Sequence, residues 1–492
     1  MKQTFIFLSM LLLTPLATLH AADAPAPMPT YHFTSPTVKD YSPFDPNGAI
    51  YFNGRYHLGY IAQMDDIEGD GKHFWGHVSS ADLIHWQMHP PILSPGPEGG
   101  IYSGNAFIDK KGRVVLSYLG TKVSSMCLAI AEDKDLDVFK KHEANPVIKK
   151  VWDPHCWVEN DIYYAIGSGY AKRAVPLYTC SDDSLTNWTP VGPFFTHEMA
   201  DVYVTEDLSC PDFFKLGDKH VLLGISHIRG ARYYVGSFDG KQFRPEAHYR
   251  MNWPGGTCFA PESLVDAKGR RIMWAWVVGS PSTMSLPRVL SMESDGILHI
   301  NPPEELNTLR TRAQALKEQA VPSDSTVVAE GIRGDCKELH VIMDPQQAAQ
   351  CGVKVRCSSD GTEETVIAYE PSRKTLRIEM SKSSLDKKRM PRAYVMPWVF
   401  NPKGIENPVV SFQEAPFELK VGELLDLRIY LDHSILEVFA NGRQCITQRI
   451  YPTRHDSVGV AFFARSGAAK VASLEAWDMN PTTLTSLPKT AN

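Results

Sequence analysis

Between residues 31 and 303 the chain alternates apolar and polar positions in short runs separated by Gly, Asn and Asp. An alternation with a period of two is typical of half-buried strands, and no stretch here sustains a helical period. Residues 49–52 and 56–60 form the first such pair, joined by an Asn53-Gly54 turn, which is a strong hairpin signal. The pattern predicts an all-β domain.

The same hairpin pattern recurs along the chain at a spacing of roughly fifty to sixty residues, which fits one four-stranded propeller blade. The later pairs span residues 106–119, 156–167, 212–225 and 263–277. Polar residues introduce each pair, at Asp45, 103–105, Asp153, 206–209 and Glu262. We therefore predict a five-bladed β-propeller over residues 30–310, with an acidic funnel where the inner strands meet.

A second all-β domain is predicted after this region. Residues 306–318 are compatible with a short helix, and residues 323–325 resemble a connector. Strand-like runs follow at residues 338–343, 364–369, 376–380, 425–431, 435–439, 445–450 and 457–463. This number of strands suits a two-sheet arrangement, so we predict a C-terminal β-sandwich over residues 325–479.

Composition narrows the class of protein. The chain has 492 residues, of which 43% are hydrophobic and 22% charged, and this length predicts two or three folded domains. The 50 basic and 56 acidic residues give a formal charge of −6, and no basic stripe is interleaved with aromatics, so nucleic acid is not an expected partner. The nine cysteines contain no Cys-x-x-Cys pair. We expect mostly buried free thiols, with Cys351 and Cys357 the pair that would bond if any does.

The N-terminus has the features of a secretory signal peptide. Met1-Lys2 precedes an apolar run over residues 5–13, and small residues follow at Ala21, Ala22 and Ala24. The apolar run is too short to anchor the chain in a bilayer. We expect residues 1–22 to be removed and the protein to be secreted or periplasmic, without a membrane anchor.

Carboxylates that converge on one funnel suit glycosidic bond cleavage, which uses one ionised and one protonated acid. Metal binding is the alternative that we considered. His73 and His77 are four residues apart but in a strand-like context, which does not favour zinc. The acidic segment Asp65, Asp66, Glu68 and Asp70 lacks the EF-hand spacing and is interpreted as a solvated loop.

Several segments, in order along the chain, resemble the motifs of glycoside hydrolase family 32, the β-fructofuranosidases. They are residues 44–48, 74–77, 82–86, 102–104, 152–154, 210–214, 269–274, 285–288, 306–310, 432–439 and 449–452. The resemblance implies a five-bladed propeller followed by a sandwich. It also implies retaining cleavage of fructosyl linkages in sucrose or in levan- or inulin-type fructans, with no cofactor. A related furanosidase, a fructosyltransferase and a non-catalytic glycan-binding propeller are the alternatives.

Carried over by motif, Asp45 would be the nucleophile and Asp153 the carboxylate that stabilises the transition state. For both residues the structural alternative is a turn-former that bonds its own backbone. The family motif has Glu directly before Cys-Pro-Asp, where this chain has Ser209. We favour Glu206 as the replacement acid/base because of its reach, followed by Asp207 and then Glu262; a surface acidic pair is the structural alternative.

The sugar contacts also depart from the family pattern, because Phe44 replaces Asn and Trp152 replaces Arg. An indole in place of a guanidinium removes a bidentate contact and adds a stacking face. The predicted substrate-binding residues are Asn47, Gln63, Trp75, Ser103, Trp152 and Asp207. For Trp75, packing inside a blade is the alternative.

Overall fold

The computed structural model describes residues 26–35, 43–63, 70–169, 175–196, 199–203, 206–294, 296–396 and 406–486. Strands make up most of these residues, which confirms the all-β class. The predicted signal peptide, residues 1–22, and the acidic segment 65–68 lie outside the described residues. None of the described helices has the length and apolar character needed to cross a bilayer.

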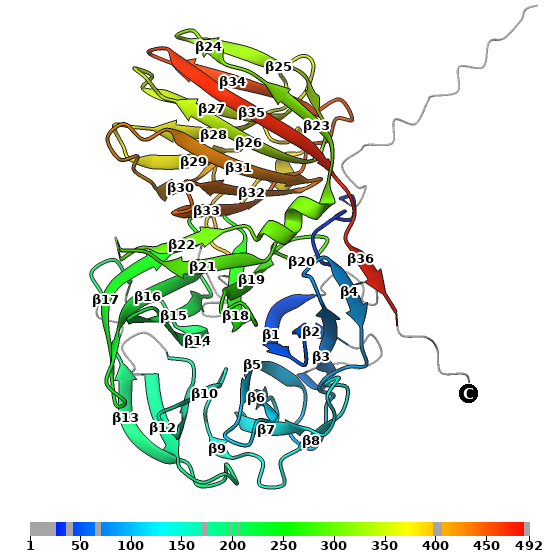
Figure 1. Cartoon of the computed structure of the whole chain (residues 1–492), viewed down its shortest axis with the longest axis vertical. Helices are drawn as coiled ribbons and strands as arrows, with labels where there is room; N and C mark the ends of the chain where they lie inside the picture. Colours follow the sequence, from blue (N-terminus) through cyan, green and yellow to red (C-terminus); the bar gives the residue numbers. More distant parts are fainter. Residues whose placement is uncertain are drawn as a thin grey trace, which may run out of the picture.

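Within the described residues, the strands up to residue 301 form five consecutive sheets, drawn from blue to green in Figure 1. The first contains β1 (Phe44–Phe52), β2 (Arg55–Gln63), β3 (His73–Ser80), β4 (His85–Met88) and β36 (Thr483–Thr485). The second contains β5 (Ile101–Ile108), β6 (Val114–Gly120), β7 (Ser125–Ala131), β8 (Phe139–Lys141) and β9 (Ile148–Lys149). The 3-10 helix η2 (Asp70–Lys72) precedes β3.

The remaining three sheets repeat the same order. The third contains β10 (His155–Glu159), β11 (Ile162–Ile166), β12 (Val175–Cys180) and β13 (Thr189–Phe195). The fourth contains β14 (Ser209–Leu216), β15 (Lys219–Ser226), β16 (Gly230–Phe238) and β17 (Phe243–Arg250). The fifth contains β18 (Cys258–Val265), β19 (Arg271–Val277), β20 (Thr283–Met284), β21 (Arg288–Met292) and β22 (Leu298–Asn301). The first two strands of each sheet are the five predicted hairpins.

The five first strands surround a common axis (Figure 1). β1 contacts β5, β5 contacts β10, β10 contacts β14, β14 contacts β18, and β18 contacts β1 again. Each pair of neighbouring sheets shares at least one apolar cluster. The strands are therefore buried on both faces, which explains why a strand such as β6 is apolar almost throughout.

The C-terminal region contains two larger sheets packed on one apolar core. One contains β23 (Arg310–Leu316), β24 (Gln319–Val321), β26 (Cys336–Asp344), β31 (Leu425–Asp432), β32 (Ile435–Ala440), β33 (Gln444–Arg449) and β35 (Ala469–Met479). The other contains β25 (Ser325–Arg333), β27 (Gln350–Cys357), β28 (Thr365–Glu370), β29 (Thr375–Glu379), β30 (Phe412–Pro416) and β34 (Gly459–Arg465). The 3-10 helix η4 (Lys387–Arg389) lies between β29 and β30.

One prediction for this region needs correction. The helix-compatible segment 306–318 is helical only in the 3-10 helix η3 (Glu304–Leu309), because the following residues pair with β35 as strand β23. Sheet pairing overrides a weak local preference here. The expectation of mostly buried free thiols is confirmed, since all nine cysteines are free, including Cys351 and Cys357 on β27.

The two regions are joined through the N-terminal segment. The carboxylate of Asp432, on β31, accepts hydrogen bonds from the backbone N–H groups of Thr30, Tyr31 and His32. It also lies 2.8 Å from Nδ1 of His32. These buried, charge-assisted bonds hold the start of the chain against the second region.

Candidate active site

Each first strand is irregular where it approaches the axis. Asp45, Asp153, Cys210 and Ala260 have φ values of 28°, 44°, 48° and 42°, and each is followed by proline. Proline donates no ladder hydrogen bond, and the pairing register shifts at these points in β1, β14 and β18. β5 shows the same shift at Ser103. Bulges of this kind redirect side chains and are frequent beside active sites.

The side chains at these irregularities form an upper ring: Asp45, Ser103, Asp153, Cys210 and Ala260. The hydroxyl of Ser103 donates to Oδ2 of Asp45 at 3.1 Å. The thiol of Cys210 lies 3.7 Å from the same oxygen, and its backbone N–H donates to Asp153 at 3.3 Å. The structure therefore brings the two predicted catalytic aspartates to one place from different sheets.

A lower ring lies two residues further along each strand, on the same strand face. It consists of Asn47, Asn105, His155, Asp212 and Glu262. Each of these side chains accepts a hydrogen bond from the next sheet. The pairs are Asn47 with Gly104 N–H, Asn105 with Cys156 N–H, His155 with Phe213 N–H, Asp212 with the Ser263 hydroxyl, and Glu262 with Ala49 N–H. The last bond returns to the first sheet. The lower ring thus ties the five first strands together and fixes the positions of the upper ring.

Asp45 has the features of a nucleophile. Its Oδ2 is held by Ser103 and Cys210, whereas its Oδ1 is buried and has no partner among the described residues. Burial, followed by the nearby charge of Asp153, raises the pKa of Asp45 to about 6. The predicted structural role does not account for a carboxyl oxygen left unpaired in the protein.

Asp153 lies beside Asp45 with one oxygen fully occupied. Oδ2 accepts the hydroxyl of Ser168 at 2.5 Å and the N–H of Cys210. Burial raises the pKa of Asp153, although these bonds and the charge of His227 counteract that effect. An acid fixed in this way is suited to stabilising positive charge on a neighbouring group.

Glu206 is buried in an ion pair. Oε1 accepts from Arg250 at 2.7 Å and from the N–H of Tyr203, and Oε2 accepts from Arg250 at 2.9 Å and from Arg232 at 3.3 Å. Burial alone would raise its pKa, but the bond to Arg250 and the charges of Arg232 and Arg250 lower the pKa to about 2. At pH 6 only about one such group in ten thousand is protonated. This arrangement argues against the prediction that Glu206 donates a proton.

Asp207 is paired with a histidine that the sequence analysis missed. Its Oδ2 lies 2.7 Å from Nδ1 of His227 and accepts the Ser209 hydroxyl at 2.8 Å, and its Oδ1 accepts the His227 N–H. Burial would lower the pKa of His227, but the bond to Asp207 and the charges of Asp207, Asp153 and Asp45 raise it. Ser209 pairs with Ile225 across the β14–β15 hairpin, so the same register places residue 207 opposite residue 227. The register shift between Ser209 and Asp212 hid this pair, because a regular hairpin with the 212–223 register would place residue 207 opposite residue 228.

The predicted sugar contacts divide into buried and accessible residues. Trp75 is fully buried and its indole donates to the carbonyl of Tyr102, so it packs inside the sheets. Asn47 is also buried, and its amide donates to the carbonyl of Asp45. These two predictions are corrected, because neither side chain reaches the surface. Gln63 is half-buried beside His73, and the side chain of Trp152 is largely exposed next to Asp153.

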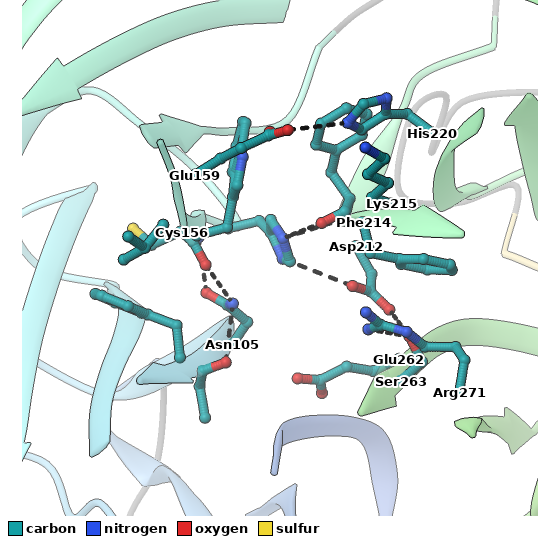
Figure 2. Close-up of a pocket in the computed structure, with 16 residues that line it drawn as sticks. Asn105, Cys156, Glu159, Asp212, Phe214, Lys215, His220, Glu262, Ser263 and Arg271 are labelled. Carbon is teal, nitrogen blue, oxygen red and sulfur yellow. Dashed lines mark hydrogen bonds and ion pairs between the residues drawn. The ribbon is translucent and has the colours of Figure 1, made fainter. Parts of the chain in front are cut away.

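Glu262, the third candidate acid, lies on the far side of the lower ring. It lines a cavity of about 340 Å³ that also contains Asp212 and Arg271. Figure 2 shows Asn105, Asp212 and Glu262 facing the same space in this cavity. A second, much smaller pocket of about 10 Å³ is lined by Glu262 together with Asp153 and Cys210. Burial, followed by the charge of Asp212, raises the pKa of Glu262 well above the ordinary value.

The histidines near the first sheet do not form a metal site. His73 contacts Gln63, whereas His77 lies with His89 and Asp137. The rings of His77 and His89 are stacked at 4.3 Å with planes 29° apart. Two imidazoles that share a metal each direct a nitrogen at it within their own ring plane at about 2 Å, and nearly parallel stacked rings do not allow that. Nδ1 of His89 instead lies 2.6 Å from Asp137.

The chain matches two family models along nearly its whole length. "Glycosyl hydrolases family 32 N-terminal domain" matches residues 32–302, and "Glycosyl hydrolases family 32 C terminal" matches residues 305–478. The levanase of Bacillus subtilis is 30% identical over 91% of this chain and 69% of its own length. The sucrose-6-phosphate hydrolase of Escherichia coli is 27% identical over 88% of this chain and 92% of its own length. The structure of fructan 1-exohydrolase IIa from Cichorium intybus matches with a TM-score of 0.80 and 22% identity, over 94% of this chain and 98% of that one.

Proposed function

The chain belongs to glycosyl hydrolase family 32, and from this membership and the geometry of the upper ring we propose that it hydrolyses β-fructofuranosidic bonds in sucrose or in levan- or inulin-type fructans. In this proposal the five sheets are the blades of a propeller, and the two C-terminal sheets form a sandwich. The sugar substrate is the partner, and the reaction uses side chains alone.

The proposal rests on the hydrogen bonds of the Asp45 carboxyl group, which leave one oxygen available. Its Oδ2 is fixed by Ser103, its Oδ1 has no partner among the described residues, and Asp153 lies beside it. A retaining glycosidase needs such a carboxylate, because one oxygen must form a bond to the anomeric carbon. Asp45 is mostly ionised above pH 6, so it is a competent nucleophile near neutrality.

The proposed reaction has two steps. Asp45 Oδ1 attacks the anomeric carbon of the fructosyl unit, the bond to the leaving oxygen breaks, and that oxygen takes a proton from an acid. Asp153 stabilises the positive charge that develops on the sugar ring. Water then attacks the fructosyl ester, gives a proton to the same catalytic group and releases fructose and Asp45.

A changed sugar preference is the second candidate function, as a related furanosidase or a fructosyltransferase. Trp152 is 44% exposed and directly precedes Asp153, and Phe44 lies against Trp276 at a ring distance of 5.6 Å. Both positions offer aromatic surface where the family pattern has polar groups, and aromatic surface favours stacking over bidentate hydroxyl recognition. Products from a panel of furanosides, with and without alcohol acceptors, will separate these candidates.

The test compares the wild type with Asp45→Asn on sucrose, levan and inulin, with free fructose as the readout. Asp218→Asn is a matched control, because Asp218 is exposed in the β14–β15 turn. We expect fructose from the wild type and the control and at least a thousand-fold less from Asp45→Asn. NMR of the first product should show the β-anomer. Turnover unchanged in Asp45→Asn, or first release of the α-anomer, contradicts the mechanism. Glycan affinity without turnover at any pH would favour a binding protein.

The proposal includes export, on the basis of the N-terminal sequence. Expression of the full chain in a bacterium should place a shortened protein in the periplasm or medium. Mass spectrometry of the mature N-terminus locates the cleavage, which we expect near Ala22. Full-length protein retained in the cytoplasm would refute export without affecting the enzymatic proposal.

A further inference from the structure

The upper ring lacks the acid that the reaction requires. Ser209 stands where the family motif has Glu, and a serine hydroxyl does not release a proton at useful pH. Both carboxyl oxygens of Glu206 are occupied by arginines, and Glu262 belongs to the lower ring, where its Oε1 accepts the N–H of Ala49. Among the described residues, a histidine near Asp45 and Asp153 offers another proton donor.

His227 occupies a suitable place. It is the first residue after β15, and its backbone N–H and Nδ1 both bond to the carboxylate of Asp207. Its carbonyl accepts the N–H of Met396 at 2.9 Å, from a segment of the C-terminal region. Its ring contacts Phe259 at 5.7 Å. The imidazole is therefore held by Asp207 and lies against Phe259, while hydrogen bonds on both sides fix the backbone that carries it.

A chain of contacts links the ring to the reacting groups. Asp207, which holds Nδ1, accepts the hydroxyl of Ser209, and the next residue, Cys210, contacts both Asp153 and Asp45. The histidine side chain is 21% exposed, in contrast to that of Asp207, which is 1% exposed. Nδ1 is the nitrogen that Asp207 holds, so the mobile proton is on Nε2. An Asp that fixes the tautomer of a catalytic His is a recurrent arrangement in hydrolases.

We propose that His227, positioned by Asp207, is the proton donor and acceptor of this enzyme, in place of the glutamate that Ser209 has replaced. This inference rests on the proposed function. In the first step Nε2–H of the imidazolium protonates the leaving oxygen as the bond from Asp45 to the sugar forms. In the second step neutral His227 takes a proton from the attacking water. One water is consumed, and both side chains return to their starting states.

The charges of the surrounding groups agree with this role. Among the described residues, the charges of three carboxyls act on His227, namely Asp207 from before β14, Asp45 from β1 and Asp153 from before β10. Within the described residues, β18 adds the ring of Phe259, and the segment at Met396 adds backbone. The carboxylates favour the imidazolium, so His227 remains protonated at pH values where Asp45 is already ionised. Activity should therefore fall at alkaline pH as His227 loses its proton.

The test uses two substrates that differ in leaving group, sucrose and 4-nitrophenyl β-fructofuranoside. His227→Gln should lower kcat/KM for sucrose by about 10²- to 10⁴-fold. It should leave kcat/KM for the aryl fructoside nearly unchanged, because nitrophenolate departs without protonation. The alkaline limb of the sucrose pH profile should disappear. Added azide should accelerate the variant on the aryl substrate and form fructosyl azide.

Two further variants sharpen the result. His220→Gln is the matched control, since His220 lies on β15, the strand that His227 follows, but lines the far cavity. It should keep the wild-type pH profile. Asp207→Asn should move the alkaline limb to lower pH, because the imidazolium loses its counter-charge. This second variant gives a readout even if His227→Gln folds poorly.

The outcomes are distinguishable. A wild type that releases no fructose from any substrate overturns the proposed function, and this inference with it. A wild type that is active, with His227→Gln keeping its rate and its alkaline limb, overturns only the inference. An equal loss on sucrose and the aryl fructoside also overturns it, because that pattern indicates a role in binding or structure.

Discussion

The ion pair of Glu206 allows a quantitative test, because a structural and a catalytic role predict opposite results. Glu206 is 1% exposed and bonds to Arg250 and to the fully buried Arg232. Despite the effect of burial, the two arginines lower its pKa to about 2 from an ordinary value of 4.5. At about 1.4 kcal/mol per pKa unit, this lowering is roughly 3 kcal/mol in favour of the ionised form.

Glu206→Gln keeps the shape of the side chain and removes the charge. Two guanidinium groups then lie in the protein without their counter-charge, which costs about 3–5 kcal/mol of unfolding free energy. For a region of this size that corresponds to a melting temperature lower by about 6–15 °C. Urea unfolding followed by tryptophan fluorescence measures the difference. Glu246→Gln is the control, because its ion pair with Lys219 is exposed and should contribute less than about 1 kcal/mol.

The pH dependence gives the sign of the effect independently. A carboxyl whose pKa is lowered on folding stabilises the protein above its ordinary pKa, and this stabilisation is lost as pH falls through the folded value. The wild type should therefore lose stability between about pH 4.5 and pH 2, and Glu206→Gln should lack that component. Unchanged stability in the variant, together with loss of the alkaline limb of activity, would refute our reasoning and identify Glu206 as the proton donor.

Three further predictions concern the axis and the rim. The acid limb of kcat/KM should have its midpoint near pH 6, because Asp45 must be ionised to attack; a limb near pH 4, measured on sucrose, would exclude the buried state of this carboxyl. Glu262→Gln should largely keep turnover and unfolding free energy at pH 7, because burial favours the neutral form of this carboxyl. A rate loss above ten-fold in initial-rate assays would place it in the mechanism. Trp75→Ala should lower the free energy of unfolding by about 3–5 kcal/mol in urea. Trp152→Ala should instead raise KM with an unchanged unfolding midpoint. The reverse pattern would mean that Trp75 binds the sugar and Trp152 packs in the fold.

The sequence predicted the hairpins well because each one carries its signals locally. Alternation defines the strands, and turns such as Lys111-Gly112 or Lys268-Gly269 define where they reverse. The polar residues that precede each hairpin do converge, at Asp45, Ser103 and Asp153. The sequence did not predict that these residues separate into two rings, because the separation depends on register shifts where a residue of positive φ precedes proline.

The errors at the site arise from residues far away in sequence. Glu206 was favoured for its reach, but Arg232 and Arg250 lie 26 and 44 residues later, on β16 and β17. Trp75 matched a family position, yet its indole is covered by the neighbouring sheet. Local patterns specify which strands form and do not specify which charges meet between them.

The residues at 207, 209 and 227 form one coupled set. A glutamate at position 209 would place a second carboxyl beside that of Asp207, whose two oxygens already serve the backbone and ring of His227. Serine at that position instead donates its hydroxyl to Asp207 at 2.8 Å. That bond, like those from His227, favours the ionised form of Asp207, and ionised Asp207 in turn favours the imidazolium. The residue that replaced the family acid thus supports the pair that we propose to have taken over its role. Because the hydroxyl of Ser209 supports the pair that we propose as proton donor, Ser209→Ala should weaken that donor without removing it.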